Sequence, residues 1–480
     1  MKKAIFSLAL LISQLSFAQI TSNQQALIDS LLTDYRNTRQ FSGVVLVGKN
    51  EKVIYQQAIG YSDREKQIKN AITTNFNIAS MGKTFTATMI MQLVQEGKLK
   101  LNQSINKVLP GTRIKKADSI TVFHLLTHTS GIGNYMMHPK FENDRNMLKS
   151  LSDVMPYVEE MERTMSAVGS SFDYSNSGFI VLGRIIETIT GKDYQTNLRE
   201  RIFTPSGITN SYLHYPATFQ APAEAVPYIA YTAKTYTNAV KEEFPAFSDG
   251  GMQSNATDIF RFANALLNDK LLSSAMRDTM WKGRKDMGRG GSYGFGWIDN
   301  QNQYGKQIYS HDGGGKGFSS DLKIVKDDGY VIVILINGRV DPKEISNNIL
   351  SILYKNKYKK PEKYFETVLT EVMEEMGFTY VQQHYNDLLK QYGYEKTPSP
   401  WVIIKFSDML ERIGQFNNAF AMHEIGRKEF PAETSMYNIT GQLYQFQKQF
   451  DEAERWYRKA LEIDPNDDFA KMMLANLKMK

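Results

Sequence analysis

A 34-residue period near the C-terminus constrains the fold more tightly than any other feature of this sequence. Phe416, Ala419 and Pro431 recur 34 residues later, as Phe450, Ala453 and Pro465. A period of this length is typical of a pair of antiparallel helices, which must stack on neighbouring pairs to bury its apolar face. The sequence therefore predicts an all-helical repeat region over residues 366–480, with a closing helix at 468–479.

The repeated positions resemble a known helical repeat. Gly441, Tyr444 and Tyr457 in the second copy are small and aromatic residues at the spacing of a tetratricopeptide repeat. The resemblance implies either a protein partner bound through residues 366–480 or a structural cap on the rest of the chain. Such arrays usually need several copies to be stable alone, so we expect this one to pack on its neighbouring domain.

Strand patterns occur at both ends of the segment 22–355, and helical patterns lie between them. This order favours an α+β domain in which the N-terminal and C-terminal strands meet in one sheet. A charged, proline-bearing linker at 356–365 separates the domain from the repeats. The expected strands lie within 41–61 and at 293–298, 306–310, 318–326 and 330–336, and the clearest helices lie at 77–97, 178–190 and 256–268.

The first residues carry an export signal. Two lysines are followed by an apolar run and by the small residues Ser16 and Ala18, which is the layout of a signal peptide at 1–18, cleaved after Ala18. The chain has no cysteine, which excludes disulfides and thiolate chemistry. We expect a periplasmic or secreted protein without a later membrane span. The net charge of +6, spread along the chain, gives no argument for nucleic acid.

The pattern Ser-x-x-Lys occurs three times, and its context separates the copies. Ser80 lies where an irregular segment enters an amphipathic helix, so free backbone N–H groups face it and Lys83 projects from the same face. Ser104 lies in a polar loop. Ser320 and Lys323 lie in an expected strand, where an odd separation places two side chains on opposite faces. Ser80 is therefore the candidate nucleophile and Lys83 its partner.

Two further segments add candidate site residues. Tyr174-Ser175-Asn176 precedes the long apolar helix at 178–190, and a tyrosine held near a lysine loses its proton more easily than its reference pKa of about 10 implies. His311-Asp312-Gly313 opens a run of three glycines, which lets the backbone approach a substrate closely.

A zinc hydrolase is the alternative to exclude. His124 and His128 are four residues apart, as on a metal-binding helix, but the glutamate of the zinc protease motif is missing between them. We interpret both histidines as structural and expect neither a metal nor an organic cofactor.

Together the three motifs resemble those of the serine β-lactamase and penicillin-binding protein superfamily, in its class C-like and esterase branch. The resemblance covers roughly residues 22–355 and implies an antiparallel sheet flanked by helices with a mainly helical subdomain. The better-known enzymes have Lys-Thr-Gly where this chain has His-Asp-Gly. The missing lysine weakens the case for β-lactam hydrolysis. The flanking sequences that share the likeness are LLTHTSGI at 125–132, GGMQSNATDIFRFANALL at 250–267 and YGFGW at 293–297.

The resemblance also implies a role for each residue. Ser80 forms an acyl-enzyme, and Lys83 or Tyr174 takes its proton. Asn176 orients Lys83 or the substrate amide, and His311 and Gly313 lie against the substrate. The backbone N–H groups of Ser80 and Gly314 form the oxyanion hole.

Two functions follow, and the sequence leaves both open. The first is an exported serine hydrolase that acts on a small ester, a D-amino-acid peptide or a β-lactam-like amide. The second is a catalytically weak penicillin-binding or scaffold protein whose repeats recruit a protein partner.

Overall fold

The computed structural model describes residues 20–161, 166–213, 224–240, 244–288, 290–301 and 304–478. The proposed signal peptide at 1–18 lies outside these residues. No helix within the described ranges is both long and apolar enough to span a bilayer.

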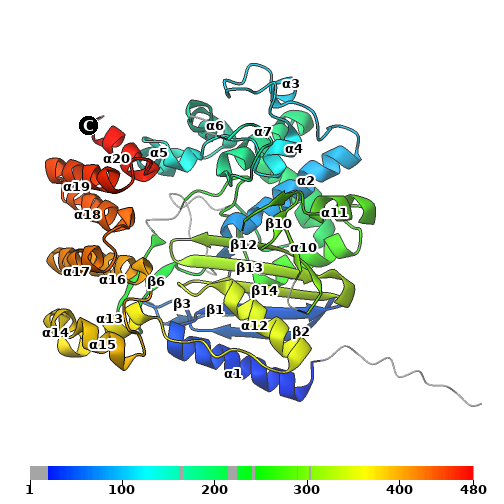
Figure 1. The fold of residues 1–480 in the computed structure, drawn as a ribbon. Coiled ribbons are helices and arrows are strands. Elements are labelled where there is room, and N and C mark those ends of the chain that lie inside the picture. Colours follow the sequence, from blue (N-terminus) through cyan, green and yellow to red (C-terminus); the bar gives the residue numbers. More distant parts are fainter. Residues whose placement is uncertain are drawn as a thin grey trace, which may run out of the picture.

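An eight-stranded antiparallel sheet forms the centre of the molecule (Figure 1). The N-terminal and C-terminal strands meet as expected, since Val45 of β1 pairs with Ile334 of β14. The order is β2 (Lys52–Ile59), β1 (Gly43–Lys49), β14 (Tyr330–Ile336), β13 (Phe318–Val325), β12 (Gln307–Gly315), β11 (Ile298–Gln301), β10 (Ser292–Tyr293) and β9 (Lys285–Asp286).

Alternating apolar residues give the central strands two buried faces. In β14, Val331, Val333 and Leu335 join the large core on one face of the sheet. Ile332, Ile334 and Ile336 join the core under α1 (Ser22–Arg39) and α12 (Pro342–Lys355) on the other face. Because both faces are covered, these strands read as continuous apolar runs rather than as alternating ones.

The large core is shared with the helical subdomain. Its helix α7 ends at Gly191, as the sequence predicts, and α10 matches the expected helix at 256–268 to within one residue. Its helices are α2 (Lys83–Gln95), α3 (Ile105–Val108), α4 (Val122–Leu126), α5 (Phe141–Asp144), α6 (Leu151–Glu160), α7 (Asn176–Thr190), α8 (Tyr194–Leu198), α9 (Thr204–Ser206), α10 (Ala256–Leu267) and α11 (Ser274–Trp281).

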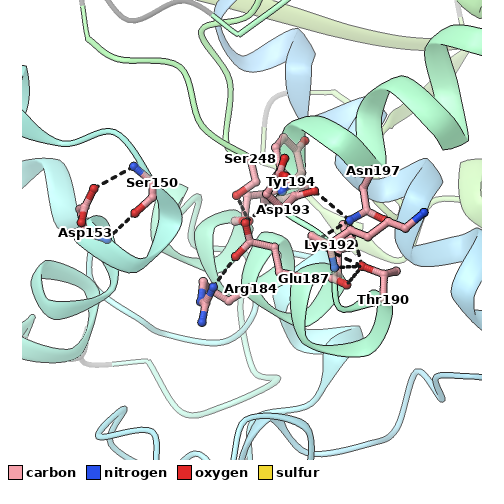
Figure 2. Close-up of polar contacts among 12 residues, drawn as sticks. Ser150, Asp153, Arg184, Glu187, Thr190, Lys192, Asp193, Tyr194, Asn197 and Ser248 are labelled. Carbon is pink, nitrogen blue, oxygen red and sulfur yellow. Dashed lines mark hydrogen bonds and ion pairs between the residues drawn. The ribbon is translucent and has the colours of Figure 1, made fainter.

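Polar contacts anchor the C-terminal end of α7 (Figure 2). The Asn197 amide donates to the Thr190 hydroxyl at 2.9 Å and to the carbonyl oxygens of Lys192 and Asp193 at 3.0 Å each. The Glu187 carboxylate accepts a bond from the backbone N–H of Tyr194 at 3.0 Å. These bonds fix the α7–α8 turn and thereby the helix whose other end carries Asn176.

Two expected strands have different bounds in the structure. The expected strand at 293–298 is interrupted, and β10 and β11 lie on either side of the break. Gly294 packs against the backbone carbonyl of Met280, and Gly296 has a positive φ of 73°, so neither continues a regular strand. Strand β12 runs five residues beyond the expected 306–310 and includes all three glycines of 313–315.

The three smallest sheets are two-stranded. They are β3 (Tyr61–Asp63) with β4 (Ile68–Lys69), β5 (Phe76–Asn77) with β8 (Gln253–Ser254), and β6 (Tyr228–Ala230) with β7 (Tyr236–Asn238).

The C-terminal helices form a column beside the end of the sheet (Figure 1). The predicted period is visible in the fold, since α17 and α19 begin at the equivalent residues Phe416 and Phe450. The column consists of α13 (Phe365–Met376), α14 (Phe378–Gln383), α15 (Tyr385–Gln391), α16 (Pro400–Arg412), α17 (Phe416–Glu429), α18 (Thr434–Phe446), α19 (Phe450–Ile463) and α20 (Asp468–Lys478).

This column packs on the first part of the chain through the β6–β7 hairpin. Ile229, Tyr231 and Ala239 belong to the same apolar cluster as the helices α13 to α18. The Tyr231 hydroxyl donates to the Asp408 carboxylate of α16 at 2.5 Å, and the Arg339 guanidinium lies 4.1 Å from the Tyr231 ring centre. The repeats therefore share a buried apolar interface with the remainder of the molecule.

Candidate active site

Ser80 lies in a tight turn between a strand and a helix. The expected helix at 77–97 begins later than predicted: β5 ends at Asn77, a 3₁₀ turn covers Ala79–Gly82, and the α-helix starts at Lys83. Ala79 has a φ of 46°, a left-handed conformation that costs free energy in a residue with a Cβ. This strained turn places the Ser80 hydroxyl at the wall of a pocket.

Lys83 is the buried centre of the site. Its Nζ donates to Ser80 Oγ at 3.1 Å, to Asn176 Oδ1 at 2.7 Å and to the backbone oxygen of Asp249 at 2.6 Å. These three acceptors match the three N–H bonds of an ammonium group. The side chain has no solvent-exposed surface, so its position is fixed by these contacts.

Tyr174 lies beside Lys83 and contacts it with its ring. Lys83 Nζ is 4.9 Å from the Tyr174 ring centre. Behind Tyr174, the His128 ring lies 4.3 Å away, centre to centre, and His128 Nδ1 accepts a bond from the Ser175 N–H at 3.1 Å. Burial keeps the pKa of His128 well below its usual value, so the ring is neutral. His128 therefore supports Tyr174, a contact that the sequence analysis did not predict.

Both ring nitrogens of His311 have partners. Nδ1 lies 2.6 Å from the Asp312 carbonyl oxygen and must donate to it, so Nε2 accepts a bond from the Tyr293 hydroxyl at 2.9 Å. Burial lowers the pKa of His311 to about 4, against the opposing charge of Asp312. His311 is thus neutral near pH 7 and supplies no positive charge to the site.

The glycines of β12 lie close to Ser80. A Cβ on Gly313 would come within 2.2 Å of the Ile78 carbonyl oxygen and 3.0 Å of the Ser80 nitrogen, so only glycine fits there. A Cβ on Gly314 or Gly315 would meet nothing within 4 Å. Gly314 and Gly315 instead line the pocket, together with Ser80 and Asn176.

Asp249 is a second buried charge that the sequence analysis missed. Its carboxylate accepts a bond from the Tyr135 hydroxyl at 3.1 Å, and Asp249 is among the residues that line the same pocket. Burial raises the pKa of Asp249 to about 6, although the charge of Lys83 acts in the opposite direction. The only local signal was the position of Asp249 directly before the glycine pair at 250–251.

Asp312 and His124, whose side chains are of types that can bind metals, have partners within the protein. The Asp312 carboxylate forms an ion pair with Lys343 at 3.1 Å. His124 Nδ1 accepts a bond from the Thr121 N–H at 3.1 Å, so His124 helps to cap α4. Within the described parts of the chain, no group of three or more histidine, aspartate or glutamate side chains could hold a metal ion.

Comparison with known proteins gives two family matches and several relatives. The beta-lactamase family model matches residues 28–354, and the tetratricopeptide repeat model matches residues 436–467. Penicillin-binding protein 4* of Bacillus subtilis (strain 168) is 27% identical over 362 residues, which cover 71% of this chain and 78% of that protein.

Solved structures show the same fold. The penicillin-binding protein from Bacillus halodurans superposes with a TM-score of 0.62 at 24% identity, covering 68% of this chain and 98% of that one. The D-amino acid amidase from Ochrobactrum anthropi superposes with a TM-score of 0.60 at 23% identity, covering 70% and 98%.

Proposed function

The chain belongs to the beta-lactamase family, and from this premise we propose that it is an exported serine hydrolase acting through an acyl-enzyme on Ser80. One observation carries the proposal: the buried Lys83 Nζ lies 3.1 Å from Oγ of Ser80, and Ser80 lines a pocket. A serine hydroxyl becomes a useful nucleophile only when a neighbouring group takes its proton.

The proposed reaction has two steps. Ser80 Oγ attacks the carbonyl carbon of the substrate, and its proton passes to the Lys83–Tyr174 pair, which returns it to the leaving amine or alcohol. Water then attacks the acyl-enzyme and frees Ser80. Lys83 donates to Ser80 in the resting arrangement, so it must release a proton before it can act as the base; Tyr174 is the alternative base.

The remaining residues position the reactants. Asn176 holds Lys83 through a 2.7 Å bond. The N–H groups of Ser80 and Gly314 are the proposed donors to the oxyanion, and a donor of this kind contributes about 3 kcal/mol. Gly313 permits this arrangement, because a side chain there would collide with the Ile78 carbonyl oxygen.

The pocket favours a small side chain next to the cleaved bond of an ester or D-amino-acid amide over a β-lactam. Its cavity volume is about 150 Å³, enough for a group of about the size of benzene. The neutral His311 offers no charge for the carboxylate of a β-lactam. A relative in fold is a D-amino acid amidase, which agrees with this substrate class.

The test compares p-nitrophenyl acetate, D-alanine p-nitroanilide and nitrocefin with the purified chain. We expect turnover of the first two, and Ser80→Ala should lower it by at least about 1,000-fold. Ser104→Ala is the matched control, because Ser104 begins another Ser-x-x-Lys pattern and should retain full activity. Equal activity of the Ser80→Ala variant would refute the assignment.

Export is proposed from the sequence of residues 1–18. The tetratricopeptide repeat match suggests a protein partner for the C-terminal helices. A fusion of residues 1–18 to a reporter enzyme should be secreted and cleaved after Ala18.

A further inference from the structure

The catalytic pocket continues into a cavity beside the repeat helices. Gly314, Gly315, Lys316 and Phe318 line the catalytic pocket on one side and this second cavity, of about 910 Å³, on the other. The far wall of the second cavity belongs to α16, whose Trp401 is 63% exposed. The pocket at Ser80 therefore adjoins a cavity that the repeat helices line.

A third cavity, of about 550 Å³, lies on the repeats. It shares Lys316, Asp408 and Arg412 with the second cavity, so each of the three cavities adjoins the next. Helices α16, α17 and α18 provide the rest of its walls. Apart from the three shared residues, the lining consists of Ile404, Ser407, Glu411, Phe416, His423, Ile439, Gln442 and Phe446.

Two residues that line this third cavity each carry a buried polar atom with no hydrogen-bond partner within the described chain: His423 Nε2 and Ser407 Oγ. Thr440 uses its hydroxyl proton on the Met436 carbonyl oxygen, so the 3.4 Å contact with His423 Nδ1 requires that nitrogen to be the donor. Nε2 of the neutral His423 ring is consequently an acceptor. Burying such an atom without a partner costs free energy that a ligand donor would recover.

Glu411 adds an acidic side chain to the same wall. Burial and the neighbouring charge of Asp408 raise the pKa of Glu411 to about 7, and Arg412 acts in the opposite direction. Arg412 bonds to Asp408 at 3.0 Å, and among the described residues no lysine or arginine forms an ion pair with Glu411. Its carboxylate lies 3.6 Å from His423 Nε2, too far for a hydrogen bond.

The chemistry of this wall matches an ammonium group. An ammonium carries three N–H donors and a positive charge, and the wall offers the His423 nitrogen, the Ser407 oxygen and the Glu411 carboxylate. Phe446, which is 71% exposed, and Phe416 lie at the same cavity and suit the alkyl stem of a lysine side chain. Lys316, Asp408 and Arg412 are the other charged groups in the lining, and Arg427 lies behind His423.

We propose that the substrate of Ser80 is an extended peptide chain, and that a lysine side chain distant from the cleaved bond binds among Glu411, His423 and Ser407. This inference rests on the proposed hydrolase activity. It gives the repeats a role in substrate selection: they form the distal part of one continuous substrate cleft.

The test uses peptide esters that carry lysine, norleucine or glutamate two to eight residues from the ester, with the full chain as enzyme. For at least one spacing we expect kcat/KM to be about tenfold or more higher with lysine than with norleucine, the effect of one charge-assisted hydrogen bond. Glu411→Gln should reduce this preference to about twofold or less and leave p-nitrophenyl acetate hydrolysis unchanged. Glu424→Gln is the matched control, because Glu424 lies exposed on α17 and pairs with Lys428.

A binding measurement separates this proposal from the hydrolase assignment. Fluorescein-labelled lysine peptides should bind Ser80→Ala, as followed by anisotropy, and bind about tenfold more weakly when Glu411→Gln is added. Selective binding without any hydrolysis would refute the hydrolase and keep the lysine site. Hydrolysis of p-nitrophenyl acetate without lysine preference at any spacing, or a preference that survives Glu411→Gln, would overturn the lysine site.

Discussion

Replacing Asp249 with asparagine should change the stability of the folded protein relative to the unchanged chain. This change should be more favourable at alkaline pH than at acidic pH. Asp249 is buried in the site, and burial is the largest cause that raises its pKa from 3.8 to about 6. Asparagine has nearly the same shape and cannot ionise. The substitution therefore removes the cost of a buried carboxylate and leaves the packing almost unchanged.

The size of the effect follows from the two pKa values of Asp249. Well below pH 3.8 the carboxyl is protonated in both the folded and the unfolded chain. As the pH rises towards 6, the unfolded chain loses its proton first, so the free energy of unfolding falls. Above pH 6 the ionised Asp249 lowers the free energy of unfolding by about 3 kcal/mol in total. About 2 kcal/mol of this loss falls between about pH 4.5 and about pH 8.

The assay is urea unfolding of both proteins at these two pH values, followed by tryptophan fluorescence. Trp281 and Trp297 are fully buried in the large core and report its unfolding. We expect the stability of Asp249→Asn minus that of the unchanged chain to rise by about 2 kcal/mol from the lower to the higher pH. Costs that do not depend on pH, such as an unpaired amide N–H, cancel in this comparison.

A control variant tests the cause. Tyr135→Phe removes the hydroxyl that donates to the Asp249 carboxylate, a bond that favours the ionised form. It should raise the pKa of Asp249 further and enlarge the loss of stability towards pH 8. A stability difference for Asp249→Asn that is the same at both pH values, within about 0.5 kcal/mol, would refute the reasoning.

Two substitutions of glycine test close contacts elsewhere. Gly313→Ala places a Cβ 2.2 Å from the Ile78 carbonyl oxygen and should lower kcat/KM for p-nitrophenyl acetate by about 100-fold. Gly315→Ala is the control: its Cβ would meet nothing within 4 Å, so kcat/KM should stay unchanged. Similar losses in both variants would contradict this. Gly441→Ala places a Cβ 2.6 Å from the Tyr457 ring and should destabilise α18 and α19 by about 1–3 kcal/mol. Amide hydrogen exchange in these two helices should become faster, while ester hydrolysis stays unchanged. Unchanged hydrogen exchange would contradict this prediction.

The sequence by itself determined the features that depend on local spacing. A separation of three residues at a helix start brings Lys83 to Ser80, and the same separation in strand β13 leads Ser320 to bond the Ile78 carbonyl oxygen while Lys323 pairs with Asp321. The 34-residue period likewise predicted the paired helices. Period and spacing are local properties of the backbone, so they can be read without knowing the fold.

Only the tertiary structure decided the chemistry around those residues. Asp249 is 166 residues from Lys83 in sequence, yet its carbonyl oxygen accepts the Lys83 bond. The neutral state of His311 depends on its burial. The hydrogen bond at its Nε2 comes from Tyr293, which lies on another strand. Protonation is set by desolvation and by neighbouring charges. The packing of the repeats on the β6–β7 hairpin depends equally on how two distant segments meet, and no local pattern encodes it.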